Sequence, residues 1–267
     1  EEAITKGMLR LSSIDSRRWI SFLLNILPKI DEISIDDLNF FEIKLLTMFH
    51  YTFWQKPIKN SGFNSVIESI RMIKKNETLF TEILELLKIR FNSIDLVDEQ
   101  IDLGFECPLD LYCNYSRDQI LSAFDYYTDE RMPAMREGVL YLKDKNIDIL
   151  FVTLNKAEKD YSPTTMYNDY SISEYLFHWQ SQSTTSETSP TGQRYINHKK
   201  LASKVLIFVR ESRNDRIGSI TLAKPYTYLG LAEYVSHKGS RPMSIIWRLK
   251  KPIPAKYLKK TNKLIVG

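Results

Sequence analysis

Residues 139–154 read VLYLKDKNIDILFVTL, and this stretch decides the fold class. Two apolar runs, residues 139–142 and 147–154, are rich in valine, isoleucine and leucine. The polar residues 143–146 between them have the composition of a turn. Apolar runs of this length, joined by so short a polar segment, are typical of paired strands. We therefore predict a β-hairpin here and a β-rich domain around it.

The sequence that follows the hairpin continues in the same pattern. Further short strand candidates are bounded by glycine, proline, asparagine or serine, and they cover residues 177–182, 205–209, 220–222, 226–228 and 244–248. Several short strands with polar turns predict a barrel or a sandwich-like β domain. Residues 181–191 are loaded with serine and threonine, and we predict a mobile surface loop there.

The sequence before the hairpin has the period of helices. Apolar residues recur at spacings of three and four within residues 15–27, 36–49, 61–73 and 78–91. Each stripe needs a partner to bury it, so a small helical bundle is expected. A connector rich in acids and turn formers follows, and Ser116 caps a short helix after it. We predict an α+β fold: an N-terminal helical domain (residues 1–110) and a β-rich barrel domain (residues 111–267).

Charge is distributed unevenly along the 267 residues. Residues 1–114 hold 13 Lys and Arg against 18 Asp and Glu, a balance of −5, whereas residues 115–267 hold 24 against 15, a balance of +9. Of the 15 tyrosines, only two precede residue 115. Only the second half therefore has the electrostatics expected of a surface that faces phosphates.

Several classes of function lack their motifs. There is no phosphate-binding G-x-x-x-x-G-K-[ST] loop, no G-x-G-x-x-G, no H-E-x-x-H and no G-x-S-x-G. Cys107 and Cys113 have no further cysteine with which to complete a zinc site, and we expect inert reduced thiols. We therefore predict no catalytic residue, no metal and no cofactor in this chain.

The chain begins at Glu1 without a signal segment, and we interpret it as a fragment of a longer protein. No apolar run approaches the roughly 20 residues that a membrane-spanning helix needs. We therefore expect a soluble, cytoplasmic protein with no membrane partner.

One tyrosine-rich segment, residues 160–170, has the residues of a base pocket. It reads DYSPTTMYNDY and combines three tyrosines with an isolated acid near its end. A pocket for an extruded base needs ring faces to sandwich it and a carboxylate to accept from the exocyclic amine of cytosine. The alternative is a loop packed on the edge of the core. The predicted pocket residues are Tyr167, Asp169, Tyr170 and Trp179, with Tyr226 and Tyr228 next.

Polar and basic side chains at strands and turns are the candidate DNA contacts. In a strand over residues 177–182, His178, Gln180 and Gln182 face away from Trp179. This periodicity also favours a core position for Trp179, and the basic turns could equally be ordinary solvated turns. The predicted contacts are His178, Gln180, Gln182, Gln193, Arg194, Arg213, His237, Lys238 and Arg241.

Several longer strings together carry a resemblance. They are FHWQSQ (177–182), SPTGQRY (189–195), FVRE (208–211), PYTYLG (225–230), YVSH (234–237) and GSRPM (239–243). They resemble the C-terminal domain of bacterial proteins that carry a phospholipase-D-like nuclease and a superfamily 2 helicase. The chain is similar to the SauUSI-like type IV modification-dependent restriction enzymes over about residues 108–260. The helical half resembles, more loosely, the coupler between motor and reader.

The resemblance implies a function in phage defence. Such enzymes cut DNA that contains 5-methylcytosine or 5-hydroxymethylcytosine, and they require ATP and a divalent metal. Their C-terminal domain recognises the target and is similar to the SRA (SET and RING associated) fold, which flips the modified base. The implied partners are modified double-stranded DNA and the helicase and nuclease domains of the same parent chain. The alternative is an interaction scaffold that touches DNA only nonspecifically.

Overall fold

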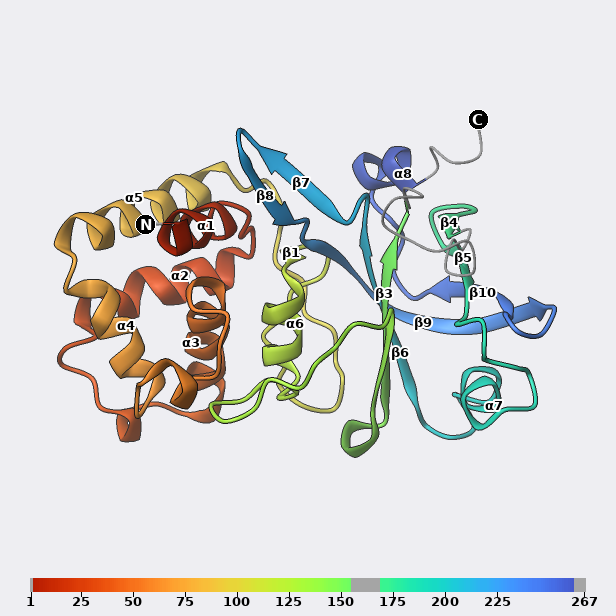
Figure 1. Ribbon diagram of the computed structural model, residues 1–267. Helices are drawn as coiled ribbons and strands as arrows, with labels where there is room; N and C mark the ends of the chain where they lie inside the picture. Colours follow the sequence, from red (N-terminus) through yellow and green to blue (C-terminus); the bar gives the residue numbers. More distant parts are fainter. Residues whose placement is uncertain (1, 155–168, 262–267) are drawn as a thin grey trace. The chain divides into compact units, whose positions relative to one another are not determined.

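The computed structural model describes residues 2–154 and 169–261 (Figure 1). It contains two compact units, which we call the helical unit (residues 1–135) and the sheet unit (residues 136–267). Helices dominate the first unit and a mixed sheet dominates the second, so the predicted α+β class is confirmed. No helix among the described residues is long and apolar enough to cross a membrane.

The helical unit is the predicted helical bundle, and polar side chains begin most of its helices. Ser16, Asn39, Ser65, Asn76 and Ser116 each accept a hydrogen bond from a backbone N–H of the first turn that follows. The bounds are α1 (Glu2–Leu11), α2 (Arg17–Ile26), α3 (Phe40–Phe53), α4 (Val66–Lys74), α5 (Glu77–Ser93), the short strand β1 (Asn114–Tyr115) and α6 (Arg117–Ala123).

Helix α6 belongs to this bundle. Gln119 donates to Thr52 Oγ1 of α3 at 2.9 Å, and the Tyr51 hydroxyl donates to the carbonyl of Thr128 at 2.8 Å. Because these buried bonds tie residues beyond 110 to α3, the compact helical unit runs to residue 135, whereas the sequence-based boundary lies after residue 110.

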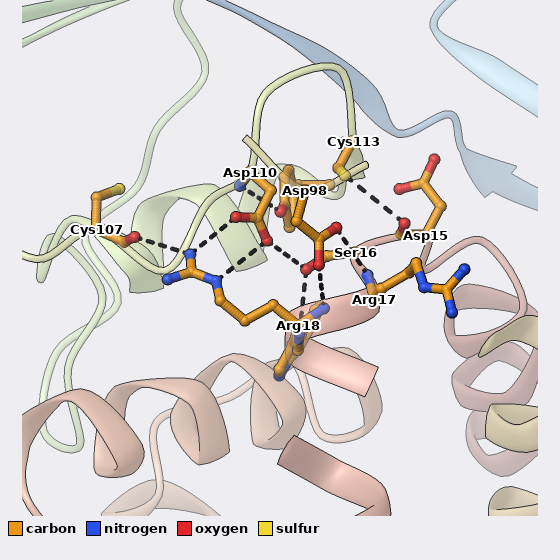
Figure 2. A network of polar contacts seen from close by, with 10 residues as sticks. Asp15, Ser16, Arg17, Arg18, Asp98, Cys107, Asp110 and Cys113 are labelled. Atoms are coloured by element: carbon orange, nitrogen blue, oxygen red, sulfur yellow. Dashed lines mark hydrogen bonds and ion pairs between the residues drawn. The ribbon is translucent and has the colours of Figure 1, made fainter. Parts of the chain in front are cut away.

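The connector between α5 and α6 is held by a network at the start of α2, which Figure 2 shows. The Asp98 carboxylate accepts from the backbone N–H groups of Arg17 and Arg18 at 3.2 and 2.6 Å, which satisfies donors that a helix start leaves open. The buried Asp110 accepts from Ser16 Oγ at 2.6 Å and pairs with Arg18 at 3.1 Å. The connector is therefore part of the folded helical unit and not a loose linker.

The two cysteines lie in the same connector, and both are buried and free. Burial raises the pKa of Cys107 to about 11, and burial also raises the pKa of Cys113. The Cys113 thiol donates to the carbonyl of Asp15 at 3.7 Å. Both residues are therefore buried free thiols, and the raised pKa disfavours the reactive thiolate form.

The sheet unit is built on strands in the order β2-β3-β6-β9-β10-β5-β4. β3 and β6 are parallel, and the other neighbours in this path are antiparallel. The strands are β2 (Val139–Leu142), β3 (Ile147–Thr153), β4 (Tyr170–Ser171), β5 (Leu176–Gln180), β6 (Lys204–Arg210), β9 (Tyr226–Lys238) and β10 (Ser244–Leu249). A separate ribbon pairs β7 (Asn214–Ile217) with β8 (Ile220–Ala223), and the helices are α7 (Pro190–Ile196) and α8 (Ala255–Thr261).

The predicted hairpin of β2 and β3 is confirmed, but the predicted barrel is not. β2 and β4 end the path of paired strands, so the described strands form an open mixed sheet. Every residue of β3 is buried, and such a strand is typical of the middle of a sheet that is covered on both faces. Strand spacing alone did not distinguish this arrangement from closure.

One face of the sheet, which we call the inner face, packs against α7. Phe177 and Trp179 of β5 and Trp247 of β10 are buried there, and the Trp179 and Trp247 rings lie 5.5 and 6.0 Å from the ring of Tyr195 in α7. These aromatic side chains form the core of this part of the unit.

The Ser/Thr-rich segment before α7, which composition predicts to be a mobile surface loop, lies only partly at the surface. Ser181, Thr185 and Ser186 are buried, and Ser181 Oγ accepts from the backbone N–H of Met243 at 2.9 Å. A Cβ on Gly192 would lie 2.0 Å from the carbonyl oxygen of Ser186. The small side chains allow two segments of backbone to pack closely, so part of this segment lies in the interior.

Candidate nucleic-acid interface

The opposite face of the same strands is polar, and we call it the outer face. Residues directly opposite one another in neighbouring strands project to the same side of a sheet. Ser244 pairs with Gln180 on one side and with Lys238 on the other, and His178 pairs with Ile246 and with Tyr170. The outer face consists of Tyr170, Leu176, His178, Gln180, Glu233, Ser236, Lys238, Ser244, Ile246 and Arg248.

A stacked pair of rings lies on this face. The Tyr170 and His178 rings have centroids 4.7 Å apart and planes inclined by only 17°. Both side chains are half-buried, and they come from β4 and β5. Flat rings at a partly exposed surface are suited to stacking against a planar base.

Asp169 directly precedes this ring pair. Only 2% of its surface is exposed, and its Oδ1 accepts from the backbone N–H of Gln180 at 2.8 Å. This bond ties the start of β4 to the end of β5. The predicted residues Asp169, Tyr170, His178 and Gln180 are thus brought together in one place.

Cations lie at the ends of the outer face. Lys238 is exposed where β9 ends, Arg241 is exposed in the turn that follows, and Arg248 is exposed in β10. The turn is held by a hydrogen bond from the Arg241 backbone N–H to the carbonyl of Thr185 at 3.1 Å. None of the three cationic groups has an acidic partner among the described residues.

The charge asymmetry is larger between the two compact units than between the two halves of the sequence divided after residue 114. The helical unit holds 15 Lys and Arg against 22 Asp and Glu, a balance of −7. The sheet unit holds 22 against 11, a balance of +11. The boundary drawn by packing therefore separates charge more completely than the boundary drawn from sequence, and the polar outer face belongs to the basic unit.

Other predicted pocket residues lie elsewhere. Trp179 is on the inner face and 4% exposed. Tyr226 and Tyr228 are buried in the first part of β9, where the Tyr228 ring stacks on Phe208 at 4.6 Å. Tyr167 lies outside the described residues. The structure therefore separates Trp179, Tyr226 and Tyr228 from the Tyr170–His178 pair.

Two of the predicted DNA-contact residues instead contact other residues of the protein. Arg194 binds the buried Asp148 with two hydrogen bonds of 2.7 and 2.8 Å and lies 3.7 Å above the ring of Tyr141. Burial acts to lower the pKa of Arg194, but the bonds and charge of Asp148 outweigh it and raise the pKa. His237 contacts the Tyr234 hydroxyl at 2.6 Å and Glu187 at 3.1 Å.

The remaining predicted contacts are dispersed. Gln182 donates to the Glu137 carboxylate at 2.8 Å, and Gln193 donates to the carbonyl of Glu187 at 2.7 Å. Arg213 is exposed at the base of the β7–β8 ribbon. Sequence reasoning missed Arg248, although the alternation of β10 points to it: Ser244, Ile246 and Arg248 alternate with three buried apolar residues.

The described residues contain no group of three or more His, Cys, Asp and Glu side chains that could hold a metal ion. The polar groups of the outer face are instead rings, an amide, hydroxyls, cations and one carboxylate, Glu233, which forms ion pairs with Lys199 and Lys250. Such a set can stack on, hydrogen-bond to and neutralise a ligand, which is the chemistry of binding.

Comparison with known proteins gives one family. A family model described as "Domain of unknown function (DUF3427)" matches residues 109–260, which is more than half of the chain. No match was found among curated proteins.

Proposed function

The chain belongs to the family described as Domain of unknown function (DUF3427), and we propose that its sheet unit recognises modified duplex DNA. In this proposal it is the target-recognition part of an ATP-dependent type IV restriction endonuclease and binds 5-methylcytosine or 5-hydroxymethylcytosine. The observation that carries the proposal is the outer face, where the Tyr170–His178 stack lies, directly preceded in the chain by Asp169, on a unit with a charge balance of +11.

The ring pair supplies a stacking platform. A base that has left the helix loses its stacking neighbours, and an aromatic side chain recovers roughly 1–3 kcal/mol per base. Tyr170 and His178 already lie nearly parallel, so little ordering would be needed before a base could stack on them.

Asp169 supplies discrimination between bases. A carboxylate accepts from the N4 amine of cytosine, whereas thymine presents an acceptor at that position. One Asp169 oxygen accepts from the backbone N–H of Gln180, which fixes the position of the carboxylate. The methyl group itself would need only a small apolar recess, so the preference for methylated over plain cytosine should be modest, about 1 kcal/mol for one buried methyl.

The cations supply the sequence-independent part of binding. Lys238, Arg241 and Arg248 are exposed around the outer face, and each phosphate that they neutralise releases counterions. The ATP and divalent metal that the resemblance implies would act in the motor and nuclease domains of the parent chain.

Binding of the full chain to matched duplexes tests the proposal. Fluorescence anisotropy would compare one duplex with cytosine, 5-methylcytosine or 5-hydroxymethylcytosine at a single site. We expect tighter binding to the modified duplexes by about fivefold, the equivalent of about 1 kcal/mol. Equal affinity for all three at physiological salt would instead support a scaffold with only nonspecific DNA contacts.

The Asp169→Asn variant tests whether this carboxylate takes part in binding the modified base. Asparagine keeps an oxygen that can accept from the Gln180 N–H, so the strand pairing should survive. We expect the variant to bind modified duplex much more weakly while its nonspecific affinity for DNA changes little. Asp144→Asn, the same change at an exposed turn, is the matched control and should behave as the wild type. Full modified-base preference in Asp169→Asn would remove this carboxylate from the site.

A further inference from the structure

The β7–β8 ribbon stands apart from the main sheet of its unit in Figure 1. Its two strands pair only with each other within the described residues, and the two-residue turn Gly218–Ser219 joins them. Gly218 has a φ of +60°, the left-handed conformation that such tight hairpin turns need. All four residues of β7 are exposed.

The register gives this ribbon two unlike faces. Asn214 pairs with Ala223 and Arg216 with Thr221, so these four side chains share one face, and all four are exposed. The opposite face carries Asp215 with Leu222, and Ile217 with Ile220. Leu222 and Ile220 are half-buried, so the partly apolar face is the more covered one and the polar face looks into solvent.

Arg216 is the central group of the polar face. Its Nε donates to the carbonyl of Gly218 at 3.1 Å, which fixes the guanidinium over the turn. No described residue accepts from its Nη groups, and the one acid of the ribbon, Asp215, projects to the other face. The polar face thus presents a cationic fork beside an amide and a hydroxyl, with no negative charge among them.

An isolated two-stranded ribbon is at best marginally stable in water, so a partner that contacts it would stabilise it. The major groove of B-DNA is about 12 Å wide and admits a two-stranded ribbon. Arginine, asparagine and threonine are among the side chains that read base edges there, and arginine prefers guanine because its fork matches O6 and N7. A groove lined by phosphates also complements the positive charge of this face.

We propose that the β7–β8 ribbon inserts its polar face into the major groove of the bound duplex, with Arg216 contacting a guanine outside the modified base pair. This inference rests on the proposed function, because it assumes that the sheet unit binds duplex DNA. In this proposal the ribbon recognises the bases that flank the modified cytosine, whereas the outer face binds the modified base itself.

The test uses the full chain and a set of duplexes in which each base pair near the modified cytosine is replaced in turn. For the wild type we expect one flanking guanine to matter, with a loss of about 5- to 150-fold when it is replaced. Arg216→Ala should bind the original and the replaced duplex equally, and Arg216→Lys should not restore the difference, because lysine lacks the bidentate fork. Arg136→Ala, the same change at an exposed arginine outside the ribbon, is the control and should keep the preference.

The outcomes separate this inference from the proposed function, because each duplex is measured with and without the methyl group. Loss of the flanking preference in Arg216→Ala, with the ratio of methylated to plain affinity unchanged, supports the ribbon as the reader of flanking bases. An equal loss of affinity on every duplex would place Arg216 on a phosphate and overturn the inference. A wild type without any flanking preference would overturn it too. A wild type without methyl preference contradicts the proposed function instead.

Discussion

In the paired strands β5 and β10, successive residues face two different environments. Trp179 and Trp247 enter the inner face and are covered by α7, whereas His178, Gln180 and Arg248 reach the outer face. The two sets come from the same few residues of backbone, so strand alternation alone separates them. Aromatic content alone therefore does not identify a binding site. The larger rings here maintain the fold, and the smaller polar ring pair is the accessible one.

The largest expected effect is on stability and comes from the inner face. Trp247 is fully buried against Trp179, Tyr195 and His198. Trp247→Ala should lower the free energy of unfolding by roughly 3–5 kcal/mol, measured by urea denaturation followed by circular dichroism. Arg248→Ala, one residue along and on the outer face, should change it by less than about 0.5 kcal/mol. Similar losses in the two variants would mean that the two faces do not differ in this way.

The next effect is on DNA binding and comes from the outer face. His178→Ala removes one ring of the stacked pair and should weaken binding to modified duplex by roughly 1–3 kcal/mol, measured by anisotropy. His237→Ala is the matched control, because His237 contacts Tyr234 and Glu187 away from this face. If His237→Ala weakened binding more than His178→Ala, the assignment of the faces would be reversed.

A smaller effect, on the pH dependence of stability, is expected from the buried histidine that packs on the inner face. His198 Nδ1 donates to the carbonyl of Ser203 at 3.2 Å, and its Nε2 accepts from the Tyr234 N–H at 2.9 Å, so the ring is neutral. Burial lowers its pKa below the ordinary value of 6.5. The unfolded chain therefore binds a proton that the folded chain does not, and stability should fall as the pH drops below 6.5.

The expected contribution of His198 is at most about 1.4 kcal/mol per pH unit, the value for one proton. Urea denaturation at pH 7 and at pH 5 would measure it. His198→Gln can still donate and accept but does not titrate, so its stability should depend less on pH than that of the wild type. An unchanged pH dependence would assign the effect to other groups, such as His50, whose pKa burial lowers to about 4.

Local sequence patterns predicted which side of a strand a residue faces better than they predicted which residues contact one another. Alternation in residues 177–182 indicated a core position for Trp179 and the opposite side for His178 and Gln180, and the strand pairing agrees. The sequence pattern did not predict the environment of the tyrosines in β9. Tyr226 and Tyr228 were candidates because of their rings, but tyrosine is also a good core residue, and composition does not separate the two uses.

Long-range pairing was beyond the sequence pattern. Arg194 and Asp148 are 46 residues apart, and neither has a local feature that names the other as its partner. A local signal for α7 was present: Ser189 followed by Pro190 is a favourable helix start, and Ser189 does accept from the Gly192 N–H. The bias toward serine and threonine in the preceding residues obscured it.

The central claim is that the outer face, and not the aromatic inner face, holds the modified base. Photocrosslinking with 5-iodocytosine tests it most directly, because the iodine occupies the position of the methyl group. After irradiation of the full chain with a duplex that carries one such base, mass spectrometry would locate the attached peptide. We expect attachment within residues 169–182, at the Tyr170–His178 pair. Attachment to α7 or to the helical unit, with none in residues 169–182, would contradict it.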